Sequence, residues 1–106
     1  MAALRLTTPR LLALGVFLDD PERERYGLDV AREAGLEPGT IYPILVAFEN
    51  AGWVRSRQED VDPHLEGRPR RRYYALTADG VSAARDALAG AGKRRGRRAA
   101  ARKLAW

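Results

Sequence analysis

The chain has 106 residues, a mass of 11.8 kDa, no cysteine and a formal net charge of +5. This length allows one small domain with a thin hydrophobic core, and the absence of cysteine excludes disulfides, thiolate metal sites and cysteine nucleophiles. The charge is uneven, because residues 1–92 hold 12 Lys and Arg against 14 Asp and Glu, whereas residues 93–106 hold seven Lys and Arg and no acid. Localised basic elements on a nearly neutral body therefore describe this chain better than a uniformly basic surface.

No apolar run approaches the roughly 20 residues that span a bilayer. The first residues, MAALRLTTPR, lack the charge and cleavage pattern of a signal peptide. We therefore expect a cytoplasmic protein without a membrane partner.

A first helix is predicted from Thr8, which can act as N-cap with Pro9 at the first helical position. The following LLALGVFL is apolar on most sides and predicts a buried helix that ends at residues 19–21. Residues 22–25 are interpreted as a charged linker. A short second helix is expected over LDVAREA, residues 28–34.

The third predicted helix has a buried face on which Ile41, Ile44, Leu45 and Phe48 recur at helical spacing. Its other face carries Thr40, Tyr42, Pro43, Val46, Ala47 and Asn50. Proline has no backbone N–H, so it is tolerated in the first turn of a helix but not in its middle. Pro43 therefore predicts a helix start near Gly39 or Thr40.

Two extended segments follow, WVRSRQE and RRRYYALT, which are rich in aromatic and β-branched residues and predict the arms of a hairpin. The intervening EDVDPHLEGRP predicts a projecting loop. In the second arm, Tyr74 and Leu76 share the face expected to point toward the core.

A last helix is predicted from Thr77, with Val81, Ala84 and Leu88 on one apolar stripe that is a candidate dimer contact. We expect this dimerisation helix over residues 78–92. The tail, residues 93–106, is then either a DNA-binding arm or a solubilising end, helical only on binding or not at all.

Three helices, a hairpin and a further helix give a mainly α fold with a small β-hairpin, in the order of a winged helix-turn-helix domain over residues 1–77. In that layout the third helix enters the major groove and the hairpin touches the DNA backbone or the minor groove. The segment GRPRRRYY, residues 67–74, then has a role, because Gly67 and Pro69 shape the loop and the arginines reach phosphate.

The motifs together resemble the PadR family of bacterial transcriptional regulators. The resemblance covers about residues 8–88 and rests on Tyr26-Gly27, PGTIYPIL, FENAGWV, GRPRRRYYALTADG and the spacing among them. It implies a homodimeric repressor with an N-terminal winged helix and a C-terminal dimerisation helix, which binds a dyad-symmetric operator in double-stranded DNA.

This chain departs from the family pattern in three places. Family members commonly carry a His-Arg or Ala-Arg pair before Leu where this chain has Val46-Ala47-Phe48, so one phosphate or base contact is expected to be missing. The segment between Tyr26 and Pro38 is short. The C-terminal region is also shorter than the dimerisation domain of larger members, which leaves one helix, together with the first, to form the dimer.

These arguments assign three sets of residues. The expected DNA-binding residues are Tyr26, Gly39, Thr40, Tyr42, Pro43, Val46, Arg68, Arg70, Arg71 and Arg72. The expected dimerisation residues are Leu11, Val81, Ala84 and Leu88. Trp53 is interpreted as core or dimer packing, with an aromatic wall for a small-molecule effector as the alternative.

No residue set predicts catalysis, a cofactor or a metal ion. His64 has no second histidine or cysteine to complete a metal site. The loop acids Asp60, Asp62 and Glu66 lie beside arginines, which favours screening of the loop over acid–base chemistry. An enzyme is therefore the least favoured class.

Two other functions remain open from the sequence. The first is a non-specific nucleic-acid-binding protein that works through its basic tail. The second is a protein-interaction module whose last helix engages the transcription machinery.

Overall fold

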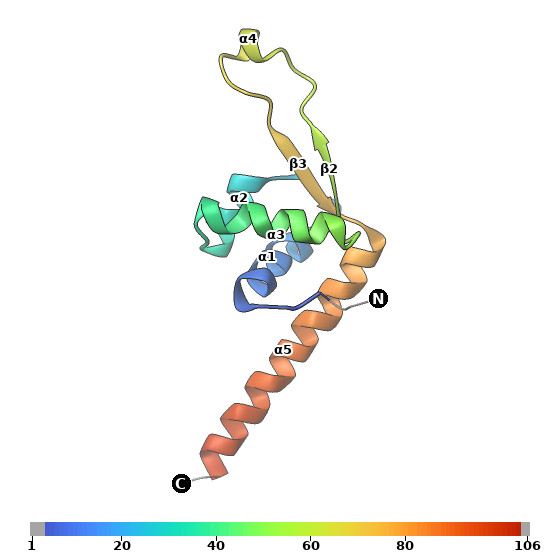
Figure 1. Cartoon of the computed structure of the whole chain (residues 1–106). Helices are drawn as coiled ribbons and strands as arrows, with labels where there is room; N and C mark the ends of the chain where they lie inside the picture. Colours follow the sequence, from blue (N-terminus) through green and yellow to red (C-terminus); the bar gives the residue numbers. More distant parts are fainter. Residues whose placement is uncertain (1–3, 105–106) are drawn as a thin grey trace.

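The structure is a computed structural model that describes residues 4–104, with side chains through Lys93. Its elements in chain order are α1 (Thr8–Asp19), β1 (Arg25–Tyr26), α2 (Gly27–Ala34), α3 (Pro38–Asn50), β2 (Val54–Gln58), α4 (Pro63–Glu66), β3 (Arg72–Leu76) and α5 (Ala78–Leu104). Figure 1 shows a three-helix body from which a hairpin and α5 extend in opposite directions. We call the hairpin, residues 54–76, the wing.

The hydrophobic core lies where α1, α2 and α3 pack together and meet the base of the sheet. Its largest fully buried side chains are Phe17, Phe48, Leu14, Ile41, Leu45 and Val30. The structure confirms the predicted buried face of α3, which is the face set by helical periodicity. It also places Thr7, rather than Thr8, at the N-cap of α1, with a proline in the first turn as expected.

The third helix begins earlier than predicted. α3 starts at Pro38, and the amides of Thr40 and Ile41 both donate to the carbonyl of Glu37. Pro38 takes the first helical position, which its fixed φ favours. Pro43 consequently lies inside the helix, where its missing N–H leaves the carbonyl of Gly39 without an intrahelical partner.

The sheet is antiparallel, with the strand order β1-β3-β2. The β2–β3 register runs from Val54 opposite Leu76 to Gln58 opposite Arg72. The interpretation of residues 22–25 as a linker was wrong for Arg25, which belongs to β1 and lies opposite Tyr74. A two-residue strand has too few residues to show a period, so only its pairing with β3 reveals it.

The wing has an ordered tip rather than the plain loop that was predicted. One turn of helix, α4, is capped by Asp62, whose Oδ1 accepts from the amide of His64 at 2.9 Å. Gly67 ends this turn in the left-handed region, with φ of 67°, a conformation that glycine adopts without the strain of a Cβ. The amide of Arg68 then closes the turn on the carbonyl of Pro63.

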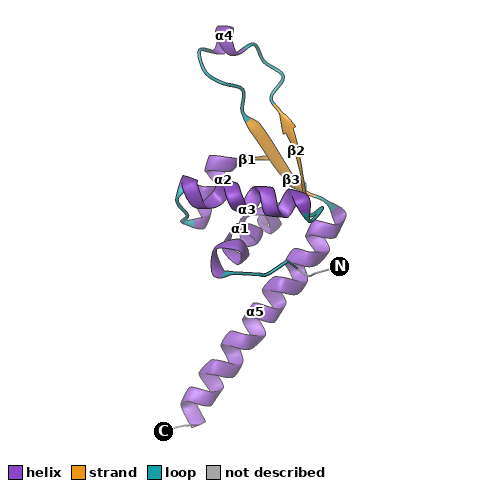
Figure 2. Ribbon diagram, viewed as in Figure 1, coloured by secondary structure: helices purple, strands orange, loops and turns teal. Residues whose placement is uncertain are grey.

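The last helix is longer than the segment 78–92 expected for it. Thr77 caps α5, because its hydroxyl accepts from the amide of Gly80 at 3.0 Å. From there α5 continues as one helix to Leu104 (Figure 2), so that part of the predicted tail is helical. Trp106 and the end of that tail lie outside the described residues. No helix within residues 4–104 is long and apolar enough to cross a membrane.

Candidate nucleic-acid interface

The outward face of α3 lies opposite the core and carries the residues predicted to contact DNA. Tyr42 is 43% exposed and Val46 is 57% exposed, and both are among the large apolar side chains that reach the surface. Gly39 and Pro43 are exposed on the same stripe, since residues three and four apart share one side of a helix. Thr40 is exposed at the start of the helix.

A cleft separates α3 from the wing, and we call it the DNA cleft. It has a volume of about 410 Å³. Its lining residues come from β1, α2, α3 and the wing: Tyr26, Gly27, Tyr42, Arg68, Pro69, Arg70, Arg71, Arg72 and Tyr74. All four arginines of GRPRRR therefore lie near Tyr42 of α3, although they are at least 26 residues away from it in the chain.

Aromatic rings support two of the basic side chains near this cleft. The Cζ atom of Arg71 lies 5.0 Å from the centroid of the Tyr26 ring, and that of Arg57 lies 5.2 Å from the centroid of Tyr73. The two tyrosine rings are themselves 6.3 Å apart. Arg57 also bonds both carboxylate oxygens of Glu24, at 2.6 and 2.9 Å. Stacking and pairing hold these guanidinium groups in place without burying them.

Arg68 has a different environment from the other cleft arginines. Its guanidinium contacts both oxygens of Glu59, at 2.7 and 3.2 Å. This hydrogen-bonded pair lowers the pKa of Glu59 from 4.5 to about 2, and the amide of Arg71 contributes a further bond at 3.3 Å. Arg68 therefore fastens the two sides of the wing loop, and its charge is largely neutralised by Glu59.

Arg70 and Arg72 are the exposed arginines of the cleft. Arg70 uses Nε to bond the carbonyl of Val61 at 2.8 Å, and Arg72 uses one terminal nitrogen to bond the hydroxyl of Ser56 at 3.0 Å. Ser56 in turn donates to the carboxylate of Glu49 on α3. Because a guanidinium has five N–H donors, both arginines keep donors for a phosphate.

The structure brings the predicted DNA-binding residues together on one surface, made by the outward face of α3 and the DNA cleft. Their contacts with DNA remain a prediction. Sequence reasoning did not find Gly27, where an added Cβ would lie 3.3 Å from Leu45 and 3.4 Å from Tyr42. It also missed Arg25, whose buried guanidinium bonds Glu33 at 2.7 Å and whose Nε has no partner among the described residues. The Tyr26-Gly27 pair was the only signal in this region.

The predicted dimerisation residues differ in how far their side chains are exposed. Leu11, Val81 and Leu88 are half-buried, so each keeps some surface for a second copy. Ala84 is fully buried in the core of the protomer itself, so its side chain has no surface to offer a partner. Trp53 packs on Phe48, with ring centroids 5.7 Å apart.

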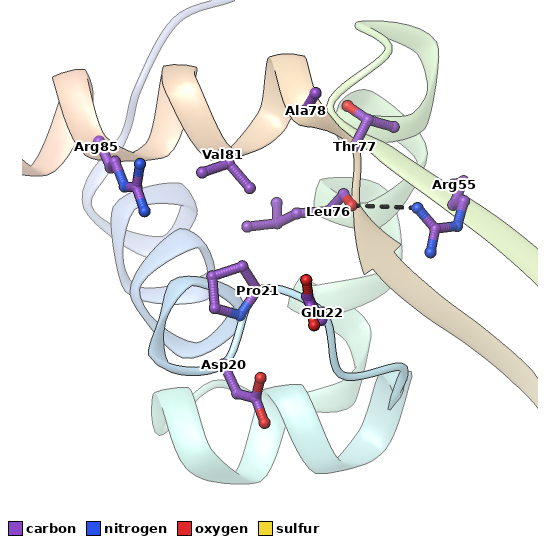
Figure 3. Close-up of a pocket in the computed structure, with 9 residues that line it drawn as sticks. All are labelled: Asp20, Pro21, Glu22, Arg55, Leu76, Thr77, Ala78, Val81 and Arg85. Carbon is purple, nitrogen blue, oxygen red and sulfur yellow. Dashed lines mark hydrogen bonds between the residues drawn. The ribbon is translucent and has the colours of Figure 1, made fainter.

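A second cavity, of about 700 Å³, lies where the wing meets α5, and we call it the wing-root cavity. Pro21, Leu76 and Val81 form its apolar floor, and Arg55, Arg85, Asp20 and Glu22 surround them (Figure 3). Arg55 donates to the carbonyl of Leu76 at 3.4 Å. Trp53 is not among the residues that line this cavity. Within residues 4–104, no group of three or more His, Asp or Glu side chains could hold a metal ion.

Three packed helices followed by a two-stranded wing define a winged-helix fold, the architecture predicted from the order of elements. The chain belongs to the PadR-like family of transcriptional regulators, whose family model matches residues 20–86. A comparison with curated proteins gave no match.

Solved structures of other regulators share the fold. A variant of ZitR from Lactococcus lactis superposes with a TM-score of 0.65 at 14% identity, covering 91% of this chain and 60% of that one. A MarR family transcriptional regulator from Silicibacter pomeroyi has a TM-score of 0.62 at 20% identity, covering 91% and 62%. BpsR from Bordetella bronchiseptica, whose DNA binding is regulated by 6-hydroxynicotinic acid, has a TM-score of 0.69 at 14% identity, covering 88% and 64%. The present chain thus spans about three fifths of the length of these proteins.

Proposed function

We propose that the protein is a homodimeric repressor that binds a dyad-symmetric operator through α3 and the wing. The observation that carries the proposal is the DNA cleft, in which Tyr42 of the recognition helix lies beside the four arginines of the wing. The protein would bind such an operator in the chromosome of a bacterium, and would therefore act in the cytoplasm.

The geometry suggests a division of tasks between the two elements. The N-terminal end of α3 presents the positive end of the helix dipole, which favours entry beside the phosphate backbone. Arg70 and Arg72 would neutralise phosphates next to the groove. In a two-fold dimer, the two copies of α3 would meet half-sites about one turn apart, roughly 34 to 36 Å.

The basic end of α5 would add affinity without choosing a sequence. Residues 93–106 carry seven positive charges and no negative charge. Contacts from such a segment to phosphate position the protein and strengthen binding, whereas contacts to bases specify the site. We therefore assign operator choice to α3 and the wing, and salt-dependent affinity to both ends of the molecule.

Fluorescence anisotropy tests the proposal. The protein is titrated against the duplex upstream of its own gene, a pool of random duplexes carried through rounds of selection, and a scrambled control, each across a salt series. We expect a preferred sequence with two-fold symmetry whose advantage persists as salt rises. A monomeric protein that binds every duplex equally would refute the proposal.

The same assay separates the two alternatives. A non-specific nucleic-acid-binding protein would lose all binding when residues 93–106 are deleted, whereas a repressor keeps its sequence preference. A protein-interaction module would bind a component of the transcription machinery and have no affinity for DNA.

We further propose that a small-molecule effector binds in the wing-root cavity. This cavity is open to solvent, combines apolar Leu76 and Val81 with charged side chains, and contacts both the wing and α5. Amide NMR titration with benzoate and benzylamine should shift the signals of Thr77 and Val81. Shifts confined to the surroundings of Trp53 would favour the aromatic wall instead.

A further inference from the structure

The recognition helix differs from the wing in having no basic side chain. The α3 sequence, PGTIYPILVAFEN, contains no Lys or Arg. Its outward face contributes the hydroxyls of Thr40 and Tyr42, the amide of Asn50 and the apolar surface of Val46. The one charge on this face, Glu49, is negative and accepts a hydrogen bond from Ser56.

The exposure of Val46 is informative because of where the residue lies on α3. Single exposed apolar residues are common on proteins and need no explanation by themselves. Val46, however, lies one helical turn beyond Tyr42, which lines the DNA cleft, so both side chains project from the same side of α3. Its neighbours Ile44 and Leu45 are 6% and 0% exposed, so the core-facing positions of this turn are taken by them and Val46 faces outward.

The chemistry of the major groove narrows what this side chain can recognise. Guanine is read mainly by Arg or Lys, through its O6 and N7 acceptors, and α3 has neither residue. The groove presents a single apolar feature at its base edges, the 5-methyl group of thymine. A valine has only methyl groups to offer, so the complementary contact is the thymine methyl.

We propose that Val46 reads the 5-methyl group of a thymine in each half-site of the operator. The inference rests on the proposed function, because it requires α3 to occupy the major groove. It makes Val46 a specificity-determining residue, while phosphate affinity comes from the wing arginines. Each half-site then contains a thymine, paired with adenine, at the position that faces the third turn of α3.

The test replaces single methyl groups in the DNA. Once selection has given the operator, each thymine is exchanged in turn for deoxyuridine, which removes only the 5-methyl group and keeps base pairing. Burial of one methyl group corresponds to about a fourfold change in affinity. We expect this loss at one thymine per half-site, and little change at the others.

A double-mutant cycle assigns the contact to Val46. In Val46→Ala the deoxyuridine penalty at that thymine should disappear, because the side chain that touches the methyl is gone. Val46 is 57% exposed, so this variant should fold, which circular dichroism checks. The matched control is Leu65→Ala, an 85% exposed apolar residue at the tip of the wing, which should keep the full penalty.

The outcomes separate this inference from the function on which it rests. Selection that enriches no sequence overturns both. An enriched operator that tolerates deoxyuridine at every position leaves the repressor in place and overturns the inference. A penalty that persists in Val46→Ala also overturns it, because another residue then reads the methyl group.

Discussion

Replacing Gly80 with alanine tests whether the start of α5 must lie directly against the turn that leads into the wing. A Cβ atom at Gly80 would lie 1.9 Å from the carbonyl oxygen of Trp53 and 3.1 Å from Cδ2 of Leu76. Thr77 holds the contact closed, since its amide donates to Trp53 at 2.9 Å and its hydroxyl donates to the carbonyl of Gly52 at 2.6 Å. The new methyl group therefore meets backbone that cannot rotate away.

The size of the effect follows from this overlap. The methyl and the carbonyl oxygen must separate by about 1.1 Å to reach 3.0 Å, the lower limit of real Cβ contacts, and overpacking of this kind typically costs about 1–3 kcal/mol. The shift also disrupts the Thr77–Trp53 hydrogen bond, for about 1 kcal/mol. The higher helix propensity of alanine offsets about 1 kcal/mol. We expect Gly80→Ala to lower the free energy of unfolding by about 1–3 kcal/mol, out of the roughly 5–15 kcal/mol of a small domain.

Urea denaturation followed by far-UV circular dichroism measures this loss. All variants are compared at one protein concentration, because the apparent stability of the proposed dimer would depend on concentration. Gly92→Ala is the matched control, since it lies in the same helix and its Cβ would meet nothing within 4 Å. It should be neutral or stabilising by up to about 1 kcal/mol. If Gly80→Ala proves as stable as Gly92→Ala, the close approach inferred at Trp53 is wrong.

Three further predictions concern charged side chains. Glu33→Gln should lower the free energy of unfolding by about 1–3 kcal/mol, because the guanidinium of Arg25 is then buried without a carboxylate. Arg25→Met should lower it less, because it removes the buried charge as well. Urea denaturation compares the two variants. In an NMR titration the pKa of the Glu59 carboxylate should be about 2, and Arg68→Gln should move it toward 4.5. The stability that this ion pair contributes is therefore complete above pH 4.5 and is lost as the pH falls to about 2. A titration midpoint that the substitution leaves unchanged would contradict the pairing. Arg72→Gln should reduce the slope of log affinity against log salt by about 1, and Arg68→Gln should change it less, since Glu59 already neutralises Arg68; equal effects would refute the assignment.

Much of the fold could be predicted because it depends on local patterns. The apolar period of residues 41–48 gave the buried face of α3 without error. Thr77 marked the start of α5, and the change to extended segments after Gly52 marked the wing. These predictions agree with the structure because each pattern depends on interactions within a few residues of its own position.

Other features escaped because they depend on distant partners. β1 is two residues long and exists only through its pairing with β3, almost 50 residues away. Pro43 predicted a start for α3 near Gly39 or Thr40, which is one or two residues later than the observed start at Pro38. The helical path of α5 beyond Gly92 also went against its glycine content.

The candidate interface shows the same division. The sequence by itself determined that an arginine-rich segment follows the third helix, and it placed Tyr42 and Val46 on the side of that helix away from the core, because helical periodicity fixes which residues face outward. Only the tertiary structure decided what each arginine does. Glu59 neutralises Arg68, Tyr26 supports Arg71, and Arg70 and Arg72 remain exposed. The four arginines of GRPRRR cannot be told apart in the sequence. What each positive charge can bind depends on the side chains that folding places next to it.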